Sequence, residues 1–179
     1  MSQEDENTGT TRAGRHMLLL AWAGGIALLT FLFNDALNLK FNPNSQPQIQ
    51  VAQDGTREVV LERNAQGHYV TSGTINGQAV VFLVDTGATD VAVPEDIANR
   101  LGLERLGSGV SQTANGAVAV WHTLLDEVSV GNIQRRRIKA SIIPSMGEGG
   151  AVLLGMSFLK PLEFSQSGGQ LILRQLPAG

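Results

Sequence analysis

The stretch VVFLVDTGAT at residues 80–89 decides the fold that this sequence predicts. An apolar run rich in β-branched residues ends at an acid, Asp85, and such a run predicts a strand buried on both faces. An unpaired carboxylate at the end of a buried strand is costly, so Asp85 requires a specific role. Thr86 supplies a hydroxyl for neighbouring backbone groups, and Gly87 lets another backbone approach closely.

Two interpretations of this motif are open on the tripeptide alone. The first is an ordinary strand-end turn in which Asp85 caps the turn, because Asp-Thr-Gly is short enough to occur by chance. The second follows from a resemblance, since the apolar strand and Asp-Thr-Gly-Ala-Thr resemble the active-site loop of the aspartic proteases. In that family the Asp shares a proton with a second Asp and activates a water molecule.

A second motif, AVLLGMSFL at residues 151–159, favours the second interpretation. In aspartic proteases of this fold, an apolar strand ending in glycine crosses beside the catalytic loop and leads into a short helix. The resemblance therefore places Leu154 and Gly155 beside the active site. Taken alone, the segment also fits a buried strand and a glycine turn, but it lacks the second glycine of a serine-hydrolase nucleophile elbow.

The two motifs together resemble the bacterial membrane-anchored retropepsin-like (clan AA) aspartic proteases, over roughly residues 59–173. The resemblance implies an all-β, single-lobe acid-protease barrel with one or two short helices. It implies a catalytic group formed by Asp85, Thr86 and Gly87. Metal ions and organic cofactors are not needed for this chemistry, in which one carboxylate takes a proton from water while the other protonates the carbonyl.

The chain contains one Asp-Thr-Gly, whereas pepsin-like enzymes carry two copies of the motif in a chain about twice as large. The second carboxylate is therefore expected from Asp85 of another subunit, in a homodimer with two-fold symmetry. Two carboxylates that lie so close together cannot both ionise easily, so the pair holds one shared proton at mildly acidic pH. Aspartic proteases are the well-known example of such a dyad, and the resemblance extends the idea to this chain.

The expected substrate is a polypeptide bound as an extended strand. Ala88 and Thr89 are expected to contact it from the catalytic loop. A second Asn-Gly hairpin lies where the family has its flap, and Ala114, Asn115 and Gly116 at its tip are expected to contact the substrate. An ordinary hairpin explains the same residues. The final strand of the family often joins the dimer interface, which implies the same for the C-terminal strand here.

Composition excludes several other classes of site. The chain has 179 residues, a formal net charge of -3 and no Cys, so neither a disulfide nor a cysteine nucleophile is available. The near-balanced charge gives no reason to expect nucleic acid as a partner. The three His residues are far apart and do not show metal-ligand spacing.

The first third of the chain predicts a membrane anchor. Residues 1–16 are polar and are expected to form a disordered cytoplasmic tail. Residues 17–33 (MLLLAWAGGIALLTFLF) carry no charge and no polar face, which predicts a transmembrane helix. A cleaved signal peptide is the alternative, but no convincing cleavage site follows. Residues 34–55 are rich in Asn, Gln and Pro and are expected to be a linker.

Basic residues favour one orientation of the span. Arg12 and Arg15 precede it, and only Lys40 closely follows it, which predicts a cytoplasmic N-terminus and an extracytoplasmic domain. The family resemblance implies a bacterial inner membrane and a periplasmic domain. A soluble protease would require protein cover for residues 17–33.

Residues 56–176 are expected to form the protease domain. Strands are predicted at 57–63, 68–75 and 78–84, with Asn76-Gly77 as a tight turn, and a short helix is predicted at 94–102. The leading hypothesis is a membrane-anchored aspartic endopeptidase. A non-catalytic module of the same fold that binds peptides or mediates dimerisation is the alternative.

Overall fold

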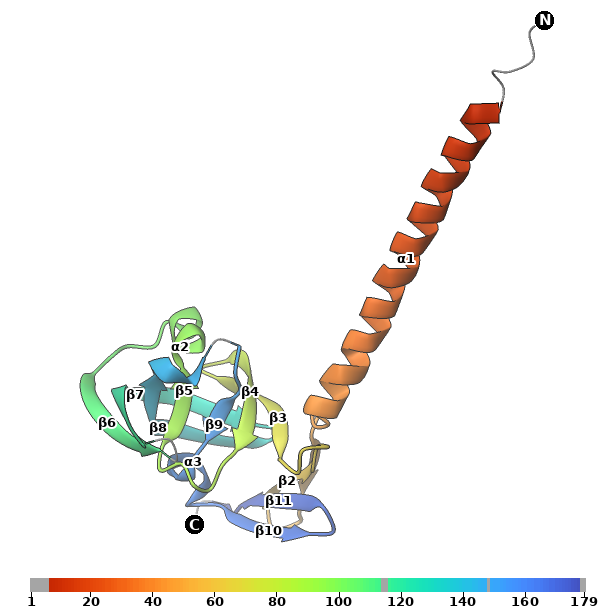
Figure 1. Cartoon of the computed structure of the whole chain (residues 1–179). Helices are drawn as coiled ribbons and strands as arrows, with labels where there is room; N and C mark the ends of the chain where they lie inside the picture. The colour runs from red at the N-terminus through yellow and green to blue at the C-terminus, as the bar shows by residue number, and fades with distance from the viewer. Residues whose placement is uncertain (1–6, 114–115, 148, 178–179) are drawn as a thin grey trace, which may run out of the picture. The chain divides into compact units, whose positions relative to one another are not determined.

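The computed structural model describes residues 7–113, 116–147 and 149–177, with an N-terminal helical unit and a compact domain spanning Leu39–Gly179 (Figure 1). In chain order the elements are α1 (Asn7–Phe41), β1 (Gln48–Val51), β2 (Arg57–Glu62), β3 (Val70–Ile75), β4 (Gln78–Val84), β5 (Val91–Pro94), α2 (Glu95–Leu101), β6 (Gly107–Thr113), β7 (Gly116–Val130), β8 (Ile133–Ile143), the 3-10 helix η1 (Pro144–Met146), β9 (Val152–Leu154), α3 (Met156–Leu159), β10 (Glu163–Ser167) and β11 (Gln170–Gln175).

Helix α1 contains the apolar stretch that the sequence assigned to a membrane span. Gly14–Leu32 is long and apolar enough to cross a membrane, with a mean hydropathy of 1.5, and its side chains are exposed in the structure. The helix begins at Asn7, so residues 7–16 are helical where a disordered tail was expected. A helix nucleated over apolar residues extends into its neighbours because each added residue gains a hydrogen bond.

The expected linker at 34–55 is in large part ordered structure. Helix α1 continues to Phe41, and β1 pairs antiparallel with β2. Asn44 is 3% exposed, and its side chain bonds both backbone groups of Glu62, donating to the carbonyl at 2.9 Å and accepting from the N–H at 2.7 Å. An Asn amide has the donor and acceptor of a peptide group, so Asn44 extends the ladder where a linker was predicted.

Two sheets form the domain, which confirms the predicted all-β class. One has seven strands in the order β3-β4-β9-β5-β8-β7-β6 and closes on itself where Thr74 and Ile75 of β3 pair with β7. The other has four strands in the order β1-β2-β11-β10. Strand β11 lies between β2 and β10 of its own chain, so both edges of the C-terminal strand are occupied.

The hairpin of β3 and β4 positions the acid of the first motif. Asn76 and Gly77 both have positive φ angles, 50° and 76°, as a two-residue type I′ turn requires. Strand β4 spans Gln78–Val84 and ends directly before Asp85. Val80 and Phe82 are buried, but Val81 is half-buried beside an open depression, so the expectation of burial on both faces is wrong.

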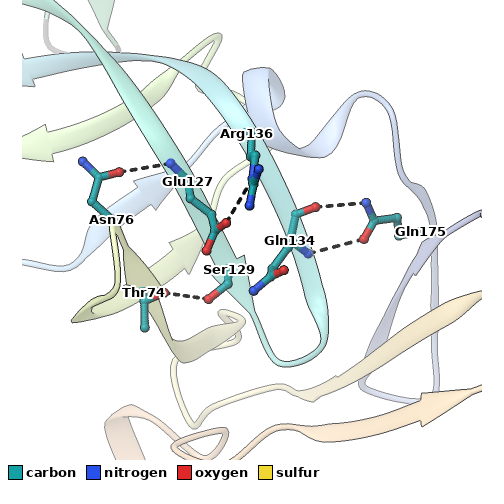
Figure 2. A network of polar contacts seen from close by, with 7 residues as sticks. All are labelled: Thr74, Asn76, Glu127, Ser129, Gln134, Arg136 and Gln175. Atoms are coloured by element: carbon teal, nitrogen blue, oxygen red, sulfur yellow. Dashed lines mark hydrogen bonds and ion pairs between the residues drawn. The ribbon is translucent and has the colours of Figure 1, made fainter. Parts of the chain in front are cut away.

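Polar side chains join several strands of the domain (Figure 2). Gln175 of β11 bonds both backbone groups of Gln134, accepting from its N–H at 3.3 Å and donating to its carbonyl at 3.0 Å. The Thr74 and Ser129 hydroxyls lie 2.7 Å apart where β3 meets β7. These contacts link β11 to β8 and β3 to β7, so they help to fix the register of these strands.

Candidate active site

Asp85 leaves the end of β4 in a tight loop that orients its carboxylate. Its Oδ1 accepts the N–H of Gly87 at 2.8 Å, and its own N–H donates to the carbonyl of Leu154 at 3.2 Å. The N–H of Ala88 donates to the Asp85 carbonyl at 3.3 Å, which closes the turn. Asp85 is half-buried and lines a cavity.

The second motif crosses directly beside this loop. The N–H of Met156 donates to the carbonyl of Ala88 at 2.8 Å, and the N–H of Ser157 donates to the carbonyl of Thr89 at 2.9 Å. A Cβ at Gly155 would overlap the carbonyl oxygen of Asp90, so only glycine allows this crossing. The structure thus brings together two segments that are about 70 residues apart in the chain.

Ser157 ties the crossing to two further strands. Its Oγ accepts the N–H of Val91 at 3.0 Å and donates to the carbonyl of Lys139 at 2.8 Å. Strands β5 and β8 are parallel neighbours at this point, and β9 pairs with β4 through Val84 and Leu154. The loop therefore rests on hydrogen-bonded elements on several sides, which restricts its motion.

A cavity of about 470 Å³ opens at Asp85. Its lining comes from the Asp85 loop, strand β6, and strands β5, β8 and β9: Asp85, Gly87, Ala88, Thr89, Asp90, Ala92, Ser111, Gln112, Ser141, Ile143 and Leu153. Polar atoms lie around the carboxylate, and aliphatic side chains form part of the wall. This volume and mixture suit a side chain of a peptide or another small organic group.

The hairpin expected to be a flap borders this cavity through β6. Ser111 and Gln112 line it, and Val118 of β7 packs against a small apolar cluster of Ala92, Val120 and Ile143. Ala114 and Asn115 lie outside the described residues. Gly116 begins β7 with φ +105° and pairs with Thr113. The predicted substrate contacts at the hairpin tip remain predictions.

Several cavity residues were not singled out from the sequence. Asp90 directly before β5, Ala92 in β5 and Leu153 in β9 line the cavity, and Ser141 and Ile143 line it from β8. Strand alternation offered a signal for β8, since Ser141 and Ile143 are two residues apart and share a face. Alternation does not reveal which face meets the cavity, because that depends on the pairing of β5 with β8.

The remaining two residues of the predicted catalytic group lie at the surface. Thr86 and Gly87 are exposed at the tip of the loop, beside the half-buried Asp85. Among the described residues, no group of three or more acidic or His side chains could hold a metal ion. Carboxylates, hydroxyls and a side-chain amide are the polar side-chain groups that line the cavity.

Comparison with known proteins shows the family to which the chain belongs. A family model described as gag-polyprotein putative aspartyl protease matches residues 71–161, which is just over half of the chain and includes both motifs. The chain belongs to this family. A solved retropepsin-like aspartic protease from Rickettsia conorii is 25% identical, with a TM-score of 0.54 over 72% of this chain and 94% of that chain. The aspartyl protease domain therefore has a retropepsin-like fold.

Curated relatives of this aspartyl protease family member are uncharacterised. A Sinorhizobium protein, described by its position in the cobV 5′ region, is 38% identical over 116 residues, 63% of this chain and 49% of its own length. A Rickettsia prowazekii protein is 30% identical over 106 residues, 58% of this chain and 45% of its own length. The chain thus spans about half the length of the curated relatives it matches.

Proposed function

We propose that this protein is an aspartic endopeptidase that hydrolyses polypeptides with a water molecule held between two copies of Asp85. The observation that carries the proposal is the position of Asp85 at the mouth of a cavity of about 470 Å³, with its carboxylate oriented by the Gly87 N–H at 2.8 Å. Family membership and the retropepsin-like fold support the same reaction class.

Each residue of the proposed catalytic group has a distinct task. One Asp85 carboxylate takes a proton from the attacking water while the other protonates the carbonyl oxygen of the substrate. Thr86 braces the two loops against each other, and Gly87 lets them approach. Ala88 and Thr89 position the extended substrate from below, and the hairpin around Gly116 closes over it.

A second copy of the chain completes the proposed site. One Asp-Thr-Gly is present, and a water-activating pair needs two carboxylates at about hydrogen-bond distance. The exposure of Thr86 and Gly87 supports this step, because loop residues that meet across a two-fold axis are exposed in one isolated copy.

The proposed location is the bacterial inner membrane. Residues 17–33 cross the membrane once, with residues 1–16 in the cytoplasm and the protease domain, residues 56–176, in the periplasm. The long apolar stretch Gly14–Leu32 supports the span. Arg12 and Arg15 before the span support this orientation. Anchoring raises the local concentration of the chains and thereby favours the dimer. Alkaline extraction of membranes, with protease protection of each end, tests the anchor and its orientation.

The activity is tested with the full chain in detergent micelles and an unfolded protein as substrate, between about pH 4 and 7. We expect cleavage by the unaltered chain and none by Asp85→Asn, which preserves the shape of the side chain and removes its charge. Asp126→Asn is the matched control, because Asp126 is exposed and lies on β7, away from the cavity lining.

Three outcomes separate the possibilities. Cleavage that depends on Asp85 and not on Asp126 supports the peptidase. A folded dimer that cleaves nothing contradicts the peptidase and favours the non-catalytic peptide-binding module. Cleavage that survives Asp85→Asn contradicts the assignment of the catalytic residue.

A further inference from the structure

The chain passes from the proposed membrane span into the folded domain within a few residues. The span ends at Phe33, because the charge of Asp35 is costly inside the hydrocarbon layer. The compact domain begins at Leu39, and helix α1 continues through this interval to Phe41. At 1.5 Å per residue, the helix rises about 12 Å between Phe33 and Phe41.

Polar side chains fasten the residues after α1 to the strands of the domain. Asn64 donates to the carbonyl of Phe41 at 3.0 Å, and Asn42 donates to the hydroxyl of Ser72 at 3.0 Å. The carbonyl of Asn44 accepts the N–H of Ser72 at 3.1 Å. Asn42 and Asn44 are 8% and 3% exposed. Buried polar groups are costly to leave without partners, so this segment does not unwind to lengthen the tether.

The observed junction therefore gives the domain a much shorter reach than the predicted linker. A flexible linker over residues 34–55 would extend to about 75 Å. The observed junction spans about 12 Å as a helix, and about 20 Å to Leu39 even if the residues before it were fully extended. The polar headgroups occupy about 5–8 Å of that distance, so the domain stays close to the membrane surface.

The size of the domain then limits how far Asp85 can lie from the membrane. A compact domain of about 140 residues has a radius of gyration of about 14 Å and is about 40 Å across. Together with the tether, this places Asp85 within about 60 Å of the hydrocarbon layer, whichever way the domain faces. A peptide bond that is held farther from the membrane than this does not reach the cavity.

We propose that the substrates are extramembrane segments of proteins anchored in the same membrane, cleaved within about 60 Å of its hydrocarbon layer. This inference rests on the proposed function and the proposed location. Enzyme and substrate then diffuse in one plane, which raises their effective concentration without any new contact. The short junction between the span and Leu39 sets the limit on the distance.

Anchored substrates with the same cleavable sequence at two heights test this proposal in vesicles. The sequence is one that the chain cleaves as a soluble peptide. Helical spacers of about 20 and about 80 residues place it about 30 and about 120 Å from the membrane. We expect the full chain to cleave the near site at least about tenfold faster than the far site, since the far site is out of reach.

A longer tether is expected to remove this limit. Insertion of about 60 Gly/Ser residues after Asn38 adds a root-mean-square length of about 45 Å, so cleavage of the far site should rise. The same insertion after Ser2 is the matched control, because it lengthens the chain on the opposite side of the proposed span. Soluble peptide is expected to be cleaved equally by the unaltered chain and by both insertion variants.

Energy transfer measures the same reach without relying on peptidase activity. The chain has no Cys, so Glu104→Cys, at an exposed position after α2, provides a single labelling site. We expect efficient transfer from this label to acceptor lipids in the membrane. The insertion after Asn38 should lower the transfer, and the insertion after Ser2 should not.

The outcomes separate this proposal from the proposed function. Equal cleavage of the near and far sites by the unaltered chain overturns it, and so does energy transfer that the insertion after Asn38 leaves unchanged. Absence of all cleavage, together with transfer that falls after that insertion, contradicts the peptidase and supports the short reach of the domain.

Discussion

At the scale of single residues, Gly155 is a position where one added methyl group is expected to lower the free energy of unfolding. Its missing side chain lets the second motif cross the Asp85 loop, and an added Cβ would overlap the backbone carbonyls of Asp90 and Ala88. We expect Gly155→Ala to lower the free energy of unfolding by about 1–3 kcal/mol, because backbone atoms must move to admit the methyl group. Gly150→Ala is the control, since its Cβ would make contacts of 3.8 and 3.9 Å.

These two variants are compared by denaturant unfolding of the full chain in detergent. The expected change for Gly150→Ala is within about 0.5 kcal/mol. Equal stability of the two variants would show that the crossing is looser than the contacts of Gly155 indicate.

Asn44 is a second residue whose side chain is expected to contribute to the free energy of unfolding. Its side chain bonds the backbone of Glu62 and the carbonyl of Val70, and Asn44→Ala leaves these groups without those partners. We expect a loss of about 1–3 kcal/mol of unfolding free energy, as for other buried groups left unsatisfied. Gln48→Ala on exposed β1 is expected to change little. An unchanged stability for Asn44→Ala would mean that water replaces the amide.

At the scale of elements, the segment that joins β8 to β9 is fastened to α2 by one carboxylate. Asp96 accepts the N–H of Gly149 at 2.9 Å, and this bond holds the pKa of Asp96 below its usual value of 3.8. A lowered pKa in the folded state means that the stabilisation is present above the unfolded value. It is lost as the pH falls through the folded value.

We therefore expect the Gly149 amide proton to shift in NMR spectra as Asp96 is protonated, with a midpoint below the usual carboxyl value. In Asp96→Asn this titration should disappear, because the amide does not ionise, whereas Asp126→Asn should leave it intact. A titration of Gly149 at or above the usual carboxyl value would contradict the hydrogen bond as the cause.

At the scale of the whole molecule, a site shared by two copies has a measurable consequence in mixtures. When unaltered chains and Asp85→Asn chains are mixed in equal amounts and exchange freely, about a quarter of the dimers contain two intact chains. We expect peptidase activity per total chain to fall to about that fraction of the activity of the unaltered protein. A fall to one half would show that each copy works alone.

The β3–β4 hairpin and the position of Asp85 were predictable from the sequence because the information is local. Asn76-Gly77 predicts a two-residue turn, and the apolar run predicts a strand. Asp85 directly follows the last residue of that strand. Gly155 was predictable from the second motif through its resemblance to a known family. The expected tail and linker, residues 1–16 and 34–55, failed in part because polar composition does not reveal helix extension or the hydrogen bonds of Asn44.

The sequence by itself therefore determined the hairpin of β3 and β4, its Asn76-Gly77 turn and the acid at the end of β4. The tertiary structure alone decided which side chains line the cavity with Asp85, since Ser111, Ser141 and Leu153 come from three separate strands. It also decided that β11 lies between β2 and β10, whereas β10 pairs with β11 alone among the residues that the structure describes. The physical reason is that a two-residue period specifies a strand and its two faces, whereas its neighbours depend on pairing between segments distant in the chain.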